Sequence, residues 1–216
     1  MDTNCLESLF MKYLLETPNF SKILNDYNTH IKCIDHIAFR FLNKNDIRFS
    51  EQFTLQPDTF NFEKYGANAM WYKCDNKFNR VFVSYYTKHI DENLIKHLTF
   101  EKYQEIVKEN QYLAWIITND HKINHVAIEV DDILNFTNQL ILDGYHFNMM
   151  NGTPYSIGKN GKLIQTSLMA ENIKFLFDGK EYMVPGSFVE FVQRIDNVEG
   201  FDNVNANNIV LSTNIE

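Results

Sequence analysis

The 216-residue sequence has little of what marks several common classes of protein. Its three cysteines, Cys5, Cys33 and Cys74, are widely spaced and form neither a C-x-x-C zinc pair nor a disulfide framework. No basic cluster is present, and 28 acidic against 20 basic residues give a net charge of −8, which disfavours nucleic acids and anionic membranes as partners. The chain has neither a signal-peptide pattern nor the roughly 20-residue apolar run of a membrane helix. We therefore expect a reduced, cytoplasmic protein.

What the sequence does contain is enough apolar material for a sizeable core, since 44% of its residues are hydrophobic. No low-complexity linker divides the chain, so we expect a single domain over residues 1–216. Helical spacing covers residues 3–27, and Pro18 is expected to separate two helices there.

The remaining periodicity predicts an α+β fold. The strands expected in the first half are 31–42, 69–74, 80–87 and a short one at 112–118, with a turn at 75–77, a helical connection at 91–110 and no clear pattern at 43–66. In the second half, Asp131 and Asp132 precede an apolar stripe that predicts a helix ending at Gly144. The strands expected after it are 164–168, 173–177 and 187–194.

Two eight-residue segments follow nearly the same pattern. Residues 34–41 read Ile-Asp-His-Ile-Ala-Phe-Arg-Phe, and residues 123–130 read Ile-Asn-His-Val-Ala-Ile-Glu-Val. An echoed histidine suggests a duplicated unit, and one inward imidazole per copy is a natural beginning for a metal site.

Alternation along a strand gives each copy one apolar and one polar face. The apolar faces carry Ile37, Phe39 and Phe41 in the first copy and Val126, Ile128 and Val130 in the second. The polar faces carry His36, Ala38 and Arg40 in the first copy and His125, Ala127 and Glu129 in the second. An alanine between two polar side chains suits a cavity wall, because it leaves room for a ligand.

The histidines also have a simpler interpretation. A single histidine on a strand is more often a hydrogen-bonded core residue or a surface residue, and the repetition brings the two interpretations to about equal weight. If both strands lie at sheet edges, Arg40 and Glu129 are ordinary solvated charges.

Glu190 interrupts the apolar segment 188–192. A buried carboxylate costs free energy unless it is paired or bound to a metal, and the alternative to metal binding is an ion pair with Arg40 or Arg194. Two histidines and one carboxylate are the ligand set of the facial triad of non-haem Fe(II) oxygenases. His36, His125 and Glu190 are therefore candidate metal ligands.

Four short segments resemble motifs of the DUF1338 family, which is named for 2-oxoadipate dioxygenase/decarboxylase. These segments are residues 35–40, 124–126, 163–167 and 185–191, and they occur in the family's order. The resemblance implies a vicinal-oxygen-chelate type of fold, in which paired βαβββ modules form a partly open barrel, here with N-terminal helices. Residues 30–120 would form the first module, with helical additions, and residues 121–200 the second.

The resemblance also implies an Fe(II) site made by His36, His125 and Glu190, with another divalent metal as the alternative. Arg40 matches the family's arginine that holds a substrate carboxylate, a task that suits a guanidinium. Gln165 is a candidate second donor beside the substrate, or else a plain strand residue.

By this resemblance we expect an Fe(II)-dependent dioxygenase/decarboxylase that acts on a small 2-oxo acid with O₂, as in the conversion of 2-oxoadipate to 2-hydroxyglutarate. The chain is shorter than the characterised dioxygenase, so the resemblance does not determine the substrate of this chain. The alternatives are another metal-dependent isomerase or lyase on the same scaffold, and a non-enzymatic module that binds a small molecule.

Two other patterns point elsewhere. His121 and His125 have the i, i+4 spacing of a helical zinc pair, but no glutamate follows His121 as that motif requires. Residues 158–162, Gly-Lys-Asn-Gly-Lys, lack the spacing of a phosphate-binding loop and predict a hairpin turn instead.

Overall fold

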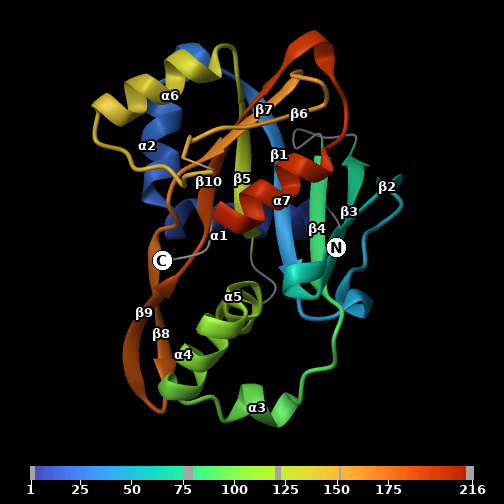
Figure 1. Ribbon diagram of the computed structural model, residues 1–216, viewed down its shortest axis with the longest axis vertical. Helices are drawn as coiled ribbons and strands as arrows, with labels where there is room; N and C mark the ends of the chain where they lie inside the picture. Colours follow the sequence, from blue (N-terminus) through green and yellow to red (C-terminus); the bar gives the residue numbers. More distant parts are fainter. Residues whose placement is uncertain (1–2, 75–79, 120–122, 151, 213–216) are drawn as a thin grey trace.

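The computed structural model describes residues 3–74, 80–119, 123–150 and 152–212 (Figure 1). Its strands are β1 (Ile31–Phe41), β2 (Phe53–Phe62), β3 (Ala67–Cys74), β4 (Arg80–Tyr86), β5 (Ile123–Val130), β6 (Ser156–Gly158), β7 (Leu163–Ser167), β8 (Asn172–Phe177), β9 (Lys180–Pro185) and β10 (Phe188–Arg194). Its α-helices are α1 (Thr3–Glu16), α2 (Pro18–Asp26), α3 (Glu92–Lys96), α4 (Phe100–Glu109), α5 (Gln111–Asn119), α6 (Ile133–Leu142) and α7 (Asn203–Ser212).

The large sheet has the strand order β2-β3-β4-β1-β5-β10-β7-β6 and curls into a half-barrel. At its centre β1 and β5 are antiparallel, and each has a parallel partner on its outer side, β4 beside β1 and β10 beside β5. The order β1-β4-β3-β2 on one side therefore repeats as β5-β10-β7-β6 on the other. This repetition is what the echoed segments predicted, because the two copies are the two central strands.

The two halves of the sheet differ in what connects their strands. Helix α6 joins β5 to β6, whereas the described link between β1 and β2 contains only a 3₁₀ turn at Lys44–Asp46. The β8–β9 hairpin is inserted between β7 and β10 and lies beside α4 at one end of the molecule (Figure 1). The expected α+β fold with N-terminal helices and a partly open barrel is confirmed; the exact module boundaries stay a prediction.

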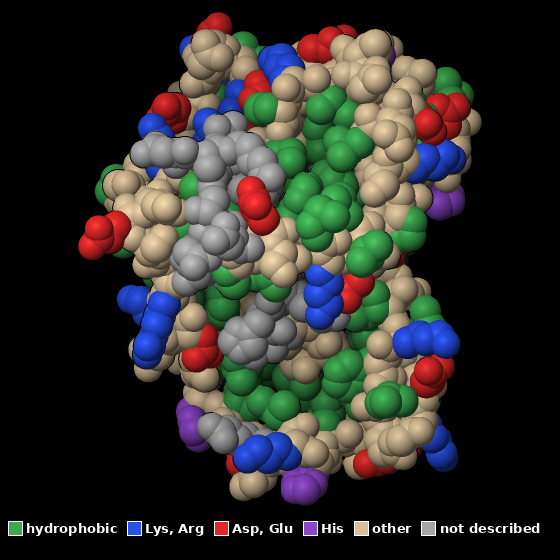
Figure 2. All heavy atoms as spheres, turned by 180° about the vertical axis from the view of Figure 1, so that it is seen from behind, with side chains coloured by type: hydrophobic (Ala, Val, Ile, Leu, Met, Phe, Trp, Pro, Cys, Tyr) green, Lys and Arg blue, Asp and Glu red, His purple; other side chains and the backbone are tan. Residues whose placement is uncertain are grey.

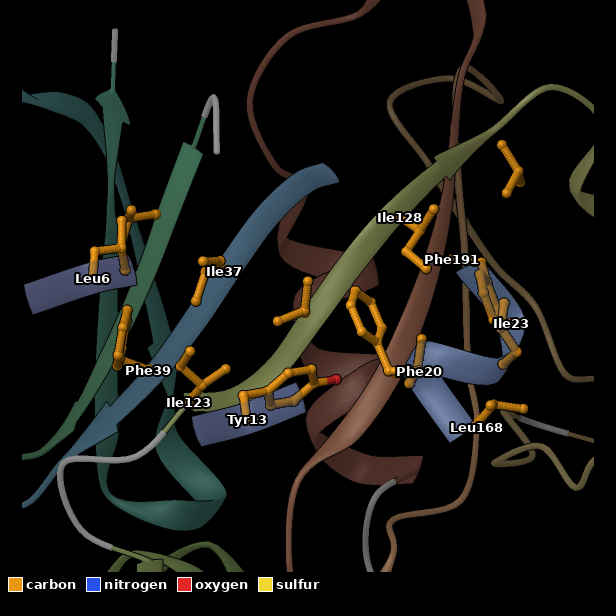
Figure 3. Packing of buried hydrophobic residues seen from close by; sticks show 14 of the residues in the cluster. Leu6, Tyr13, Phe20, Ile23, Ile37, Phe39, Ile123, Ile128, Leu168 and Phe191 are labelled. Carbon is orange, nitrogen blue, oxygen red and sulfur yellow. The ribbon is translucent and has the colours of Figure 1, made fainter. Parts of the chain in front are cut away.

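One face of the half-barrel is the main hydrophobic core. Leu6, Tyr13, Phe20 and Ile23 of the N-terminal helices pack there against apolar side chains of the central strands (Figure 3). The strand residues that point to this face include Ile37, Phe39, Val126, Ile128 and Phe191. The predicted apolar faces are confirmed, and helix α7 crosses the opposite face (Figure 1).

Helix α5 corrects one prediction, because residues 112–118 were expected to form a strand. Seven of its nine residues are buried, so the helix has no polar face to reveal a helical period. A short continuous apolar run does not distinguish a buried strand from a buried helix by its pattern.

The turn predictions have different outcomes. Residues 158–162 connect β6 to β7, and Lys159, Asn160 and Gly161 have positive φ angles of 50°, 56° and 84°, so the hairpin interpretation is confirmed. The turn expected at 75–77 and the residue His121 both lie outside the described residues.

The described helices include none with the length and the apolar composition needed to cross a bilayer. On the face shown in Figure 2, Lys and Arg side chains lie scattered among acidic ones, and hydrophobic side chains gather in its middle.

We expect Phe136→Ala to destabilise the protein by about 3–5 kcal/mol, because Phe136 is fully buried and contacts Phe191 and Tyr27 edge-on. On the same helix, Leu142→Ala should change stability by less than about 0.5 kcal/mol, since Leu142 is 86% exposed. Urea unfolding measures both variants. Equal losses in the two would contradict the position of the core.

Candidate metal centre

Three side chains converge on the face of the half-barrel that is opposite the main core. His36 on β1, His125 on β5 and Glu190 on β10 each offer one ligand atom, and these atoms lie within 4.8 Å of one another. His36 Nε2 lies 3.2 Å from His125 Nε2. Glu190 Oε1 lies 3.8 Å from His36 Nε2, and its Oε2 lies 3.3 Å from His125 Nε2. A shared metal site requires this convergence.

Strand register explains how bulky side chains can meet there. His36 is paired with Ala127 across β1 and β5, and His125 is paired with Ala38. Ala127 is also paired with Glu190 of β10. The methyl group of Ala127 thus separates His36 from Glu190 within one row, so both long side chains can lean over it toward His125.

Each histidine is oriented by the residue that precedes it. Asp35 Oδ1 lies 2.7 Å from His36 Nδ1, and Asn124 Oδ1 lies 3.0 Å from His125 Nδ1. Neighbours on a regular strand point to opposite faces, but Asp35 and Asn124 are both extra residues at irregularities in the β1–β5 pairing. The bulges let the acceptor and the histidine lie on one side. This role was missed from the sequence, although the shared Asp or Asn before each histidine was its signal.

Asp35 is held by two arginines. Arg194 donates to both of its oxygens, from Nε at 2.5 Å and from Nη2 at 3.0 Å, and Arg80 Nη1 donates at 3.1 Å. Burial alone would raise the pKa of Asp35, but the hydrogen bonds from His36 and Arg194 outweigh it and hold this pKa below its usual range. Arg194 therefore neutralises Asp35, and the ion pair considered for Glu190 does not form within the described residues.

The protonation of the three candidate ligands follows from burial. Burial lowers the pKa of His36, and it lowers the pKa of His125 well below its usual range, so both rings are neutral near pH 7. With each Nδ1–H donating to its oxygen acceptor, both Nε2 atoms present lone pairs. Burial also raises the pKa of Glu190 to about 8.

These residues fit a divalent metal. Two lone pairs face each other at 3.2 Å, and Glu190 Oε2 has no hydrogen-bond partner within the described part of the chain. A cation among the three atoms would satisfy all of them at once, and oriented imidazoles with a carboxylate suit Fe(II) or Zn(II).

Gln165 lies beside the three candidate ligands rather than on a remote part of its strand. Its Nε2 donates to Glu190 Oε1 at 2.6 Å, which orients the carboxylate. The space above the ligands is only about 30 Å³, and Phe201 and α7 form part of its wall. Phe201 contacts His36 edge-on at 4.8 Å between centroids; neither it nor α7 was identified from the sequence.

A larger cavity of about 280 Å³ adjoins this space, with Val210 in the lining of both. Its walls come mainly from α4, α5 and the segment 183–188, and they include the aromatic rings of Phe100, Tyr103, Tyr112, Trp115 and Phe188. Arg40 lies in this cavity, 6% exposed, with its guanidinium 4.7 Å from the Tyr112 ring and 5.3 Å from the Trp115 ring.

Arg40 has no carboxylate partner among the described residues, unlike the other buried arginine, Arg194. Burial lowers its pKa to about 10, which still leaves it charged at neutral pH. A buried cation that lies against aromatic rings and has no such carboxylate partner is suited to receive an anion. Glu129, by contrast, pairs with Lys32 at 3.3 Å and lines neither space.

Comparison with known proteins finds relatives of this chain in sequence and in fold. Residues 72–200 match the family described as 2-oxoadipate dioxygenase/decarboxylase. The chloroplastic 2-oxoadipate dioxygenase/decarboxylase of Arabidopsis thaliana is 31% identical over 111 residues, and the chloroplastic/amyloplastic one of Oryza sativa is 32% identical over 111 residues. Each match covers 45% of this chain but only 30% of the relative.

Solved structures share the fold over nearly the whole chain. The hydroxyglutarate synthase of Oryza sativa, crystallised with 2-oxoadipate, has a TM-score of 0.81 at 21% identity. The match covers 98% of this chain and 91% of the synthase chain. A glyoxalase-superfamily protein of Ralstonia eutropha has a TM-score of 0.73 at 17% identity, and the match covers 92% of this chain and 84% of that protein's chain. The expected vicinal-oxygen-chelate type of fold is therefore confirmed.

Zn²⁺ binding at pH 7 should release about one proton, because Glu190, with a pKa of about 8, must lose its proton to become a ligand. The affinity should rise about tenfold per pH unit up to pH 8 and then level off, since both histidines are already neutral. Calorimetric titration in buffers of different ionisation enthalpy measures the release.

Glu171→Gln is the matched control for that titration. The pKa of Glu171 is also raised by burial, but its carboxylate accepts from the backbone amide of Asn19, away from the three candidate ligands. The number of protons released on Zn²⁺ binding should be the same in this variant as in the wild type. Proton release that is absent at pH 7, or that disappears in Glu171→Gln, would count against Glu190 as a ligand.

Proposed function

The chain belongs to the 2-oxoadipate dioxygenase/decarboxylase family, and from this premise we propose that it is an Fe(II)-dependent oxygenase acting on a small 2-oxo acid. The observation that carries the proposal is the convergence of His36, His125 and Glu190 beside a cavity that contains Arg40, which pairs with no carboxylate of the described residues. The curated relatives are matched over 30% of their length, so their substrate is proposed for this chain and not transferred as a fact.

The proposed reaction converts 2-oxoadipate and O₂ to 2-hydroxyglutarate and CO₂. The bond between C1 and C2 breaks, and C1 leaves as CO₂. One oxygen atom of O₂ completes a new carboxyl group at C2, and the other becomes the hydroxyl group at C3, so atoms balance. Bound iron supplies the redox chemistry with O₂, for which no amino-acid side chain is suited.

The chain's own residues hold and orient the reactants. Three protein ligands leave several positions on a metal open, which is the arrangement of the facial triad. Arg40 is proposed to pair with a substrate carboxylate, and a charge-assisted pair in a cavity lined by aromatic rings is strong because little water competes for it. The proposed role of Gln165 is to keep Glu190 directed toward the metal.

The structure also suggests why competing reactions would be limited. Phe201 and α7 line the small space above the three ligands with apolar side chains. The ring of Phe188 lies against His125, with 4.7 Å between centroids. Side chains of this kind exclude bulk water, which protects reactive species during turnover.

A cytoplasmic location stays a prediction, since both plant relatives are described as chloroplastic.

The test is oxygen uptake by the Fe²⁺-loaded protein with a panel of 2-oxo acids. With 2-oxoadipate we expect O₂ consumption, CO₂ and 2-hydroxyglutarate in equal amounts, and no uptake by Glu190→Ala. A flat oxygen trace for every acid would contradict the oxygenase proposal. Full metal binding with no O₂ uptake would favour an isomerase or lyase on the same scaffold.

Arg40→Gln should raise the KM for 2-oxoadipate by about 30-fold or more, because it removes the cation that receives the carboxylate. The matched control is Lys102→Gln on α4, where an exposed lysine pairs with Glu105 outside the cavity. Steady-state kinetics on both variants measure the effect. A KM in Arg40→Gln that matches Lys102→Gln would contradict the assignment of Arg40.

A further inference from the structure

The two histidines of the metal centre are held in the same way by different residues. Both supporting residues are extra residues at irregularities in the β1–β5 pairing, and both present an oxygen to the Nδ1 atom of the following histidine. One supporting residue is an aspartate and the other an asparagine. The two are similar in shape, so the difference that matters is one negative charge and one pair of N–H donors.

Asp35 is placed where a negative charge is already compensated. It is fully buried, Arg194 and Arg80 donate to it, and it lines neither the space above the ligands nor the large cavity. A carboxylate there strengthens the hydrogen bond to His36 without facing a ligand in the large cavity.

Asn124 is placed differently. It is 3% exposed and lines the large cavity together with Arg40. Its Oδ1 accepts from His125, whereas its amide nitrogen makes no hydrogen bond within the described residues. Asn124 therefore touches both a proposed metal ligand and the space in which the substrate would lie.

We propose that Asn124 determines specificity for anionic substrates: its oxygen orients His125, and its amide group keeps negative charge out of the cavity while offering a donor to a substrate carboxylate. The inference rests on the proposed function and deepens it, because it explains why the repeat has aspartate in one copy and asparagine in the other. An aspartate at this position would hold His125 at least as well, but it would repel the carboxylate that Arg40 attracts.

The test separates binding of the metal from binding of the anion. Zn²⁺ affinity is measured by competition with a chromophoric chelator, and the Zn²⁺-loaded protein is then titrated calorimetrically with 2-oxoadipate and with glutarate, a dicarboxylate that lacks the oxo group. Neither measurement requires turnover. The variants are Asn124→Asp, Asn124→Ala and, as the reciprocal control, Asp35→Asn.

Asn124→Asp should bind Zn²⁺ within about threefold of the wild type or more tightly, yet bind both acids about tenfold or more weakly. Asn124→Ala should lose about tenfold in Zn²⁺ affinity while weakening the acids less than Asn124→Asp does. Asp35→Asn should weaken Zn²⁺ binding about tenfold and leave acid binding to the loaded protein unchanged.

The two proposals fail in different ways. Acid binding in Asn124→Asp that equals the wild type, or a wild-type protein that binds neither acid, would overturn the role of Asn124. Weaker acid binding in Asn124→Asp, together with no oxygen uptake by the wild type, would support the role of Asn124 and overturn the oxygenase proposal.

Discussion

Two neutral imidazoles and the carboxyl group of Glu190 face one another across a space of about 30 Å³, and the rest of the site depends on what satisfies these three buried polar groups. Burial raises the pKa of Glu190 to about 8, so without a cation this carboxyl group keeps its proton at pH 7. A divalent metal would take the place of that proton and accept the lone pairs of both Nε2 atoms. The fold brings the groups together through Ala127, whose small side chain lies between His36 and Glu190 in the strand register.

The buried charged side chains of the site differ in how their charges are compensated. Asp35 and Arg194 neutralise each other behind His36, in a pair that needs no ligand. Our proposal assigns Glu190 to the metal and Arg40 to an anion in the large cavity. Since every buried charge must be compensated, the two without an oppositely charged partner among the described residues mark where the metal and the substrate are proposed to bind. The uncharged Asn124 contacts His125 of the metal centre and also lines the cavity that contains Arg40.

The sequence was informative where local pattern and chemistry coincide. The echoed segments identified β1 and β5, and the isolated carboxylate at Glu190 completed a set of residues that the structure brings together. Asp35 and Asn124 were missed because adjacent strand residues normally face apart, and only pairing between strands reveals a bulge. Helix α7 was missed because its asparagine-rich sequence has weak helical propensity; Asn205 attaches it by contacts to Leu163 and Ser156, which are distant in sequence. Strand β2 lacked a pattern because much of it is exposed and Pro57 lies where its pairing with β3 shifts.

The central claim is that His36, His125 and Glu190 bind one metal ion in the geometry that β1, β5 and β10 impose. Anomalous X-ray diffraction from crystals grown with Zn²⁺, a redox-inert substitute for Fe²⁺, tests it most directly. We expect one strong peak about 2.0–2.2 Å from both Nε2 atoms and from a Glu190 oxygen, with Asp35 and Asn124 still accepting hydrogen bonds from the Nδ1 atoms. A peak elsewhere, or none among these three side chains, would contradict it.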